Sequence, residues 1–269
     1  MSKARPDFKR MLLRLPYSPQ DYAAVAMTAE LAALLGLDLV GTFFDESSLL
    51  RFAELPTTRE FRAGGWYPLD TDQLTRELAL AAREAERLFQ EAIGRHRPKA
   101  SFAVEEGSPA KLISSMAGGG DIIAIIEPKN PIERATHQFN ELVAAALRST
   151  SSILLVPPVV RPFSGPVVVV AAGANDPSLT MALAIAVSAR ERVVIVPSQD
   201  ASLGASMMAR AEGAGVLATL APPAPSGPMP LLPALQGGRL LVMRRQQDGQ
   251  QIPFPRPHQM PILLLCSSD

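Results

Sequence analysis

The sequence contains few of the residue patterns that support catalysis or metal binding. Ser108 lies between a glycine and a proline rather than in a G-x-S-x-G turn, so we interpret it as a helix N-cap. The carboxylates of Glu105 and Glu106 would point to opposite faces of a strand, which argues against an acid–base pair. Cys266 lies in an apolar run and is interpreted as a buried, inert thiol. We expect none of the three histidines to have a ligand partner four residues later: His96, His137 and His258. The sequence therefore predicts no catalytic residue and no metal site.

Aromatic residues gather in segment 45–70, which is longer than most connections between secondary-structure elements. This segment leaves the end of an expected strand, and ligands bind at the carboxyl ends of strands in open α/β sheets. Two interpretations stay open: the segment roofs a pocket or plugs a subunit contact, or it is a packing flap over a helix. The residues that would form the pocket lid are Phe52, Phe61, Trp66 and Tyr67.

Short apolar runs alternate with helical patterns over the first 160 residues. Five runs have the composition of strands buried on both faces: Met11–Leu15, Leu37–Phe44, Ser101–Val104, Asp121–Ile126 and Ser152–Val156. The helical patterns between them cover residues 18–36, 70–93, 108–117 and 131–148. This alternation predicts an α/β fold, an open doubly wound parallel five-stranded sheet.

Residues 161–269 repeat the same order in reduced form. The matching runs are Val167–Ala171, Arg192–Val196, Val216–Leu220, Arg239–Arg244 and Pro261–Cys266. Alternate prolines between residues 253 and 257 remove the last crossover helix. Charged side chains number 38 in residues 1–160 and 14 in residues 161–269, which also indicates a boundary. We expect one domain at 1–160 and a reduced second copy at 161–269.

Composition excludes several classes of protein. Lysines and arginines balance aspartates and glutamates, so the basic surface that nucleic-acid binding needs is missing. The longest charge-free stretch, Gly213–Gly238, contains six prolines and cannot be a transmembrane helix. A single cysteine and the absence of a signal-peptide pattern favour a cytoplasmic location. We expect neither nucleic-acid nor membrane partners.

Residues 105–125, EEGSPAKLISSMAGGGDIIAI, resemble a segment of the universal stress protein family. Gly107, Pro109, Ile113, Ala117 and Asp121 occupy the positions that carry this resemblance. It extends over most of residues 8–158 and more faintly over 165–267. The resemblance implies five strands and four helices in each copy. It also implies a site that binds ATP in many members of the family.

The residues that the resemblance assigns to ATP depart from the family pattern. Leu15-Pro16-Tyr17 stands where nucleotide-binding members carry an aspartate after the first strand. The family's glycine-rich phosphate loop is replaced by residues 127–141, which contain no glycine. The resemblance therefore implies a degenerate nucleotide site at Pro16, Tyr17, Val40, Glu127, Asn130 and Asn140. In the second copy, the turn at 171–178 is the best anion cradle, and a purely structural turn is the favoured alternative.

These observations favour a non-enzymatic scaffold or sensor module of stress-response type, with a decayed nucleotide site and no cofactor. The alternative is a nucleotide-binding switch that holds ATP through an atypical loop, with slow hydrolysis left open. A weaker third interpretation is an enzyme of the same broad fold. The resemblance to tandem members of the family implies an intramolecular pseudo-dimer in which the last strands pair edge to edge. The apolar runs Ile153–Val156 and Ile262–Leu265 suit such covered edges. A homo-oligomer or a protein partner is a further expectation.

Overall fold

The structure is a computed structural model of the 269-residue chain. It describes residues 8–16, 21–45, 50, 52–53, 55, 57–62, 64–94, 96–108, 110, 113, 117–158, 164–198, 203–222, 237–245 and 260–266. Tyr17, Ser18 and Pro19 lie outside the described residues, as does the proline-rich segment that was expected to replace a helix in the second half.

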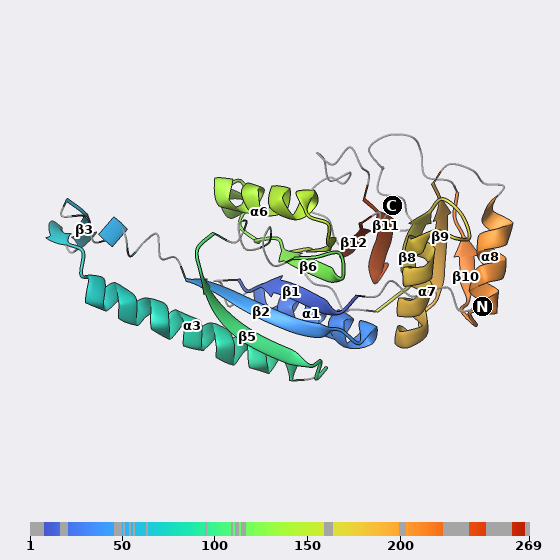
Figure 1. The fold of residues 1–269 in the computed structure, drawn as a ribbon, viewed down its shortest axis with the longest axis horizontal. Helices are drawn as coiled ribbons and strands as arrows, with labels where there is room; N and C mark the ends of the chain where they lie inside the picture. Colours follow the sequence, from blue (N-terminus) through green and yellow to red (C-terminus); the bar gives the residue numbers. More distant parts are fainter. Residues whose placement is uncertain are drawn as a thin grey trace.

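Ten strands form one continuous sheet that runs through both halves of the chain (Figure 1). The strands of the first half lie in the order β7-β6-β1-β2-β5, and those of the second half in the order β10-β9-β8-β11-β12. The first-half strands are β1 (Arg10–Arg14), β2 (Asp38–Asp45), β5 (Ala100–Glu106), β6 (Asp121–Ile126) and β7 (Ser152–Val156). The second-half strands are β8 (Val167–Ala171), β9 (Val193–Pro197), β10 (Ala218–Leu220), β11 (Leu240–Arg244) and β12 (Ile262–Leu265). The predicted parallel α/β sheet is confirmed, because strands pair in parallel within each half.

The two halves join where β7 and β12 pair in antiparallel orientation. Leu154 lies opposite Leu263 in this pairing, and both side chains are buried. The expected contact between the runs Ile153–Val156 and Ile262–Leu265 is therefore present. Neither strand has an open edge there, because each is hydrogen-bonded to a neighbour on both sides.

Helices cover the sheet on both faces. The cluster of buried residues on one face includes side chains of α1 (Tyr22–Leu35), α3 (Thr71–Ile93), α7 (Pro177–Ala189) and α8 (Gly204–Gly213). The cluster on the other face includes side chains of α6 (His137–Arg148), which follows the short helix α5 (Pro131–Arg134). α1 ends at Gly36 in the left-handed conformation (φ 67°), which glycine adopts without strain.

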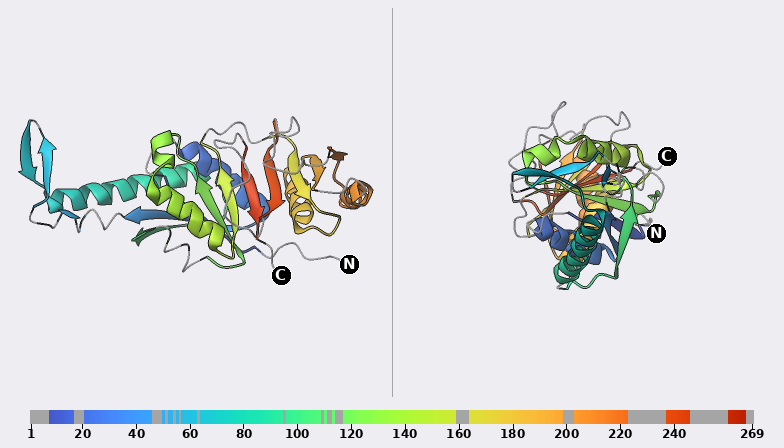
Figure 2. Two further views of the ribbon diagram at one scale, coloured as in Figure 1. Left: turned by 90° about the horizontal axis from the view of Figure 1, so that it is seen from above. Right: turned by 90° about the vertical axis from the view of Figure 1, so that its left-hand side faces the viewer.

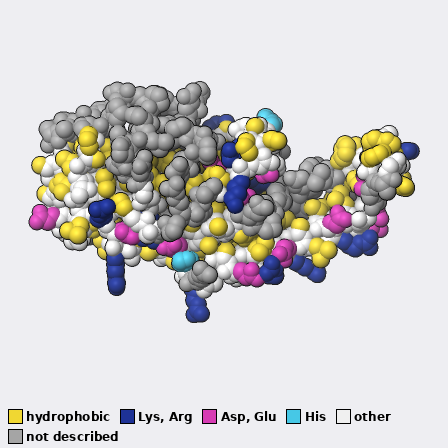
Figure 3. Space-filling view, turned by 180° about the vertical axis from the view of Figure 1, so that it is seen from behind, with side chains coloured by type: hydrophobic (Ala, Val, Ile, Leu, Met, Phe, Trp, Pro, Cys, Tyr) yellow, Lys and Arg dark blue, Asp and Glu magenta, His cyan; other side chains and the backbone are white. Residues whose placement is uncertain are grey.

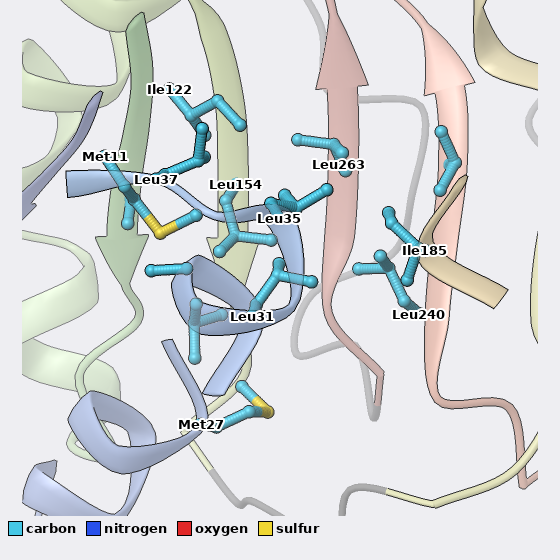
Figure 4. Packing of buried hydrophobic residues seen from close by; sticks show 14 of the residues in the cluster. Met11, Met27, Leu31, Leu35, Leu37, Ile122, Leu154, Ile185, Leu240 and Leu263 are labelled. Carbon is cyan, nitrogen blue, oxygen red and sulfur yellow. The ribbon is translucent and has the colours of Figure 1, made fainter. Parts of the chain in front are cut away.

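Alternating side chains of each strand feed these two clusters. In β6, Ile122 and Ala124 belong to the first cluster, whereas Ile123 and Ile125 belong to the second. Figure 4 shows that the first cluster crosses the junction: Leu35 of α1 and Leu263 of β12 lie in the same packed layer. The two halves therefore share one hydrophobic core.

The segment 45–70 contains a hairpin that was not predicted from the sequence. Its strands β3 (Arg59–Arg62) and β4 (Gly65–Pro68) pair in antiparallel orientation at the far end of α3 (Figure 2). Only the last third of α3 is anchored, since its buried residues are Ala85, Phe89 and Ile93. The hairpin and the first part of α3 together form an arm, residues 57–84, that projects from the body (Figures 1 and 2).

Candidate functional site

The order of the strands creates a crevice between β1 and β6. From β1 the chain crosses to β2 on one side, and from β6 it crosses to β7 on the other side. This reversal is the topological switch point of a doubly wound sheet, and ligands bind outside the carboxyl ends of the strands there. A pocket of about 450 Å³ lies at this place. Its volume is within the range of small-molecule sites.

Three regions of the chain line the pocket. The end of β1 and the residues after it supply Arg14, Leu15, Pro16 and Asp21; the end of β6 supplies Ile125, Ile126 and Pro128; and α5 and α6 supply Glu133, Thr136, Gln138, Phe139 and Leu142. The apolar wall includes the buried side chains of Leu15, Phe139 and Leu142. A second cavity of about 40 Å³ shares Arg14, Ile125 and Leu142 with the first.

Asp21 is the most unusual polar residue of the pocket. It holds the N-cap position of α1, yet its side chain caps no backbone N–H. The residue is 7% exposed, and its buried Oδ1 accepts no hydrogen bond from any residue that the structure describes. Burial raises the pKa of Asp21, with Glu133 adding to the rise and Lys129 opposing it. An unsatisfied buried carboxylate oxygen costs free energy that only a ligand or water could recover.

The segment after β6 does not resemble a phosphate-binding loop in its hydrogen bonds. The side chain of Asn130 accepts from the N–H of Ile132, and Thr136 Oγ1 accepts from the N–H of Phe139. Arg134 Nη1 donates to the carbonyl oxygens of Pro128 and Lys129. These contacts engage the N–H groups and the guanidinium within the segment itself, so they are not directed at a ligand.

The residues expected at a degenerate site are only partly brought together. Pro16 lines the pocket, whereas the fully buried Glu127 is not among the residues that line it. Asn130 and Asn140 are exposed and hydrogen-bond within their own helices, and neither lines the pocket. Val40 lies within β2, in register with Leu12 of β1, and it does not line the pocket. Tyr17 lies outside the described residues.

Glu133, whose negative charge was expected near a polyphosphate, does line the pocket, whereas sequence reasoning missed two further charged residues among the described ones that line it: Arg14 and Asp21. One signal was available for Asp21, since it is the first acidic residue after the first strand. The expectation placed the acidic position directly after β1 and therefore stopped at Tyr17.

The aromatic residues do not form a lid over this pocket. Phe52, Phe61, Trp66 and Tyr67 are about half to two-thirds exposed, and none of them lines it. This finding corrects the expected roof, because the hairpin lies at the far end of α3 rather than over the strand ends (Figure 2). Phe61 and Trp66 pack edge to face on the hairpin, with ring centroids 5.3 Å apart. Hydrophobic side chains gather at this projecting end (Figure 3). A subunit contact stays a prediction.

Other sequence candidates take structural roles. His137 does have a partner one turn away, because its Nε2 lies 3.1 Å from Glu141 Oε1; this corrects the expectation for the histidines. Both side chains are exposed, and no group of three potential metal ligands occurs among the residues described.

In the turn at 171–178, Asp176 itself accepts from the N–H groups of Ala172 and Ser178. Cys266 is half-buried and its Sγ accepts from Arg245. Among the described residues, no helix is long and apolar enough to cross a membrane.

No protein-family model matches the sequence, and no curated protein matches it. Among solved structures, the chain is similar to a universal stress protein from Archaeoglobus fulgidus, with 14% identity, a TM-score of 0.63 and 97% of each chain covered. A functionally unknown protein from Pseudomonas aeruginosa is 15% identical over 98% of this chain and 94% of its own, with a TM-score of 0.49. The cytoplasmic domain of a prokaryotic cation chloride cotransporter is 10% identical over 96% and 95%, with a TM-score of 0.47.

The first of these similarities identifies the architecture as the universal stress protein fold. The resemblance carried by residues 105–125 is thereby confirmed at the level of the fold.

Proposed function

We propose that the chain is a non-enzymatic sensor or scaffold of stress-response type, whose pocket between β1 and β6 no longer serves a nucleotide polyphosphate. The charge of the pocket carries this proposal. Asp21 and Glu133 line it with two carboxylates, and Arg14 is the single basic residue among the described ones that line it. A polyphosphate in this pocket would meet repulsion rather than a cradle of donors.

The loop after β6 supports the same conclusion. Pro128 and Pro131 have no backbone N–H, and the side chain of Asn130 already satisfies the N–H of Ile132. A phosphate-binding helix N-terminus depends on such N–H groups being available to the anion. The first turn of α5 also carries the acidic Glu133, which disfavours a second anion there.

The alternative is an ATP-binding switch with an atypical loop. Two observations favour it: the pocket keeps the position that the fold reserves for ligands, and Arg14 lines it. Calorimetric titration with ATP and ADP separates the two candidates. We expect no binding tighter than about 1 mM, whereas the switch requires a dissociation constant in the low micromolar range, about 10 μM or below. Mass spectrometry of the denatured protein gives an independent answer, since a co-purified adenine nucleotide would overturn the proposal.

We also propose that residues 1–160 and 161–269 are two copies of one unit that pack as an intramolecular pseudo-dimer. The matching strand orders and the β7–β12 pairing support this arrangement. A fragment of residues 1–160 would leave the edge of β7 open, so we expect it to dimerise or aggregate. Light scattering tests this, and a stable monomeric fragment would contradict it. The single cysteine leads us to place the protein in the cytoplasm.

A homo-oligomer or a protein partner remains part of the proposal. The arm supports it, because its exposed Phe61, Trp66 and Tyr67 lie together on one hairpin. Sedimentation at several protein concentrations, with wild type and a Trp66→Ala variant, tests self-association through the arm. The expected result is a concentration-dependent dimer that the substitution weakens. A wild-type monomer at all concentrations would exclude the homo-oligomer.

A further inference from the structure

The pocket between β1 and β6 holds a carboxylate that is buried without being satisfied. Asp21 is more than nine-tenths buried and lines the pocket, and its Oδ1 has no hydrogen-bond partner in the described part of the chain. An aspartate at an N-cap ordinarily accepts a hydrogen bond from the backbone of its own helix. Here α1 begins without that bond, so the carboxylate is left for something inside the pocket.

Carboxylates outnumber basic groups among the described residues that line the pocket. Glu133 of α5 is the second carboxylate beside Asp21, and Arg14 supplies one positive charge. Lys129 and Glu133, which are both exposed, act on Asp21 with opposite sign: Lys129 lowers the pKa of Asp21 and Glu133 raises it. A concave site with more negative than positive groups attracts small cations.

The rest of the pocket is apolar. Leu15, Phe139 and Leu142 are buried side chains that form part of its wall. A ligand that fits must therefore present hydrocarbon or an aromatic ring to this wall, and a hydrogen-bond donor to Asp21. A fully hydrated metal ion would leave the apolar wall unused.

We propose that this pocket binds a small organic cation, a protonated amine carried on an apolar body. The ammonium donates to the carboxylates of Asp21 and Glu133, and the apolar body packs against Phe139 and Leu142. The inference rests on the proposed function to the extent that both require a pocket free of polyphosphate. Binding of such a cation is the signal that the sensor would detect.

The perturbed acidity of Asp21 agrees with this ligand. Burial raises the pKa of Asp21, which means that the free pocket holds its negative charge at a cost. A bound ammonium compensates the charge and supplies the missing hydrogen bond, and charge-assisted hydrogen bonds are the stronger kind. The same reasoning predicts that Asp21→Asn leaves the free protein at least as stable as the wild type, because the buried charge is removed.

The test compares three ligands that share one apolar body and differ in charge. Phenethylamine is the cation, 2-phenylethanol is the neutral analogue, and 3-phenylpropionate is the anion. Calorimetry and ligand-observed NMR with the full chain should show binding of phenethylamine with a dissociation constant of about 1 mM or tighter, and weaker or no binding of the other two. Equal or tighter binding of phenylpropionate overturns the inference, and so does the absence of phenethylamine binding at about 10 mM.

Two variants locate the binding. Asp21→Asn should weaken the binding of phenethylamine by about tenfold or more, since the substitution removes the charge-assisted hydrogen bond. The matched control is Asp72→Asn in the first turn of α3, remote from the pocket, which should leave the affinity unchanged. Urea unfolding shows that each variant is folded. If Asp21→Asn binds phenethylamine as tightly as the wild type, the inference is overturned. If the wild type binds ATP, the proposed function is overturned. A protein that binds neither ATP nor phenethylamine refutes the inference alone.

Discussion

Replacing Arg239 by methionine tests how the two halves are held together. Arg239 precedes β11 in the second half, and its side chain is 6% exposed. Its Nη2 donates to Oε1 of Glu30 in α1 of the first half, and its Nη1 lies 3.6 Å from Oε1 of Glu191 just after α7. One buried guanidinium thus bridges the two halves, and methionine keeps much of its length without the charge.

The expected loss of stability follows from the two carboxylates that the substitution leaves without their buried partner. Removing one partner of a buried ion pair typically costs about 3–5 kcal/mol, because the other charge is stranded. Here Glu30 and Glu191 are about a quarter exposed (22% and 26%) and regain some hydration. We therefore expect Arg239→Met to lower the free energy of unfolding by about 2–3 kcal/mol. Glu30→Gln should cost only about 1 kcal/mol, because a neutral amide still accepts a hydrogen bond.

Urea unfolding measures both variants, with circular dichroism reporting all helices and the fluorescence of the single tryptophan reporting the arm. The double variant completes a cycle, and we expect a coupling energy of about 1 kcal/mol between Glu30 and Arg239. A loss below about 0.5 kcal/mol for Arg239→Met would refute the bridging role, because surface substitutions alone cost that much. So would additive effects in the double variant.

Three further predictions concern other parts of the fold. A Cβ at Gly41 would lie 2.7 Å from Cε2 of the buried Phe89 ring, so Gly41→Ala should lower the free energy of unfolding in urea by about 1–3 kcal/mol. A Cβ at Gly213 would meet nothing within 4 Å, so Gly213→Ala, the control, should lower it by less than about 0.5 kcal/mol. Burial raises the pKa of the Tyr22 hydroxyl to about 12, from 10 when the chain is unfolded. The stability that Tyr22 contributes is therefore complete below pH 10 and is lost as the pH rises to about 12. In unfolding measured as a function of pH, Tyr22→Phe should abolish this loss. Trp66 is 65% exposed, so Trp66→Ala should cost well under about 1 kcal/mol in dilute monomer, and a loss of about 3 would show that the side chain is buried in an assembly.

The sheet could be predicted from the sequence because its strands are buried on both faces. Val167–Ala171 is apolar throughout and Asp121–Ile126 is apolar after its first residue, and every residue in both runs is buried. The pairing of β7 with β12 was implied by the family resemblance, and the two apolar runs agreed with it because they needed covered edges. The start of α7 also carries a sequence signal, because an aspartate before a proline is typical of the first turn of a helix, and the side chain of Asp176 accepts from the N–H of Ser178.

The arm could not be predicted, for a physical reason. Strands β3 and β4 bury almost nothing, so they lack the alternation of buried and exposed residues that identifies a strand. The apolar stripe of α3 indicated an amphipathic surface helix. In the structure, the buried residues of this helix begin only at Ala85, and Leu80 on the projecting part is 62% exposed. Periodicity shows which face of a helix is apolar, but not what covers that face.

The location of the pocket and its ligand preference are determined by different features of the chain. Its place follows from the strand order alone, since the crossovers from β1 and β6 diverge and open a crevice at their carboxyl ends. Its preference depends on side chains that only folding brings together: Asp21 before α1 and Glu133 in α5 are 112 residues apart in the sequence. A loop that offers N–H donors would make this crevice a phosphate site. We propose that carboxylates facing the same space reverse this preference, so that one fold serves ligands of opposite charge.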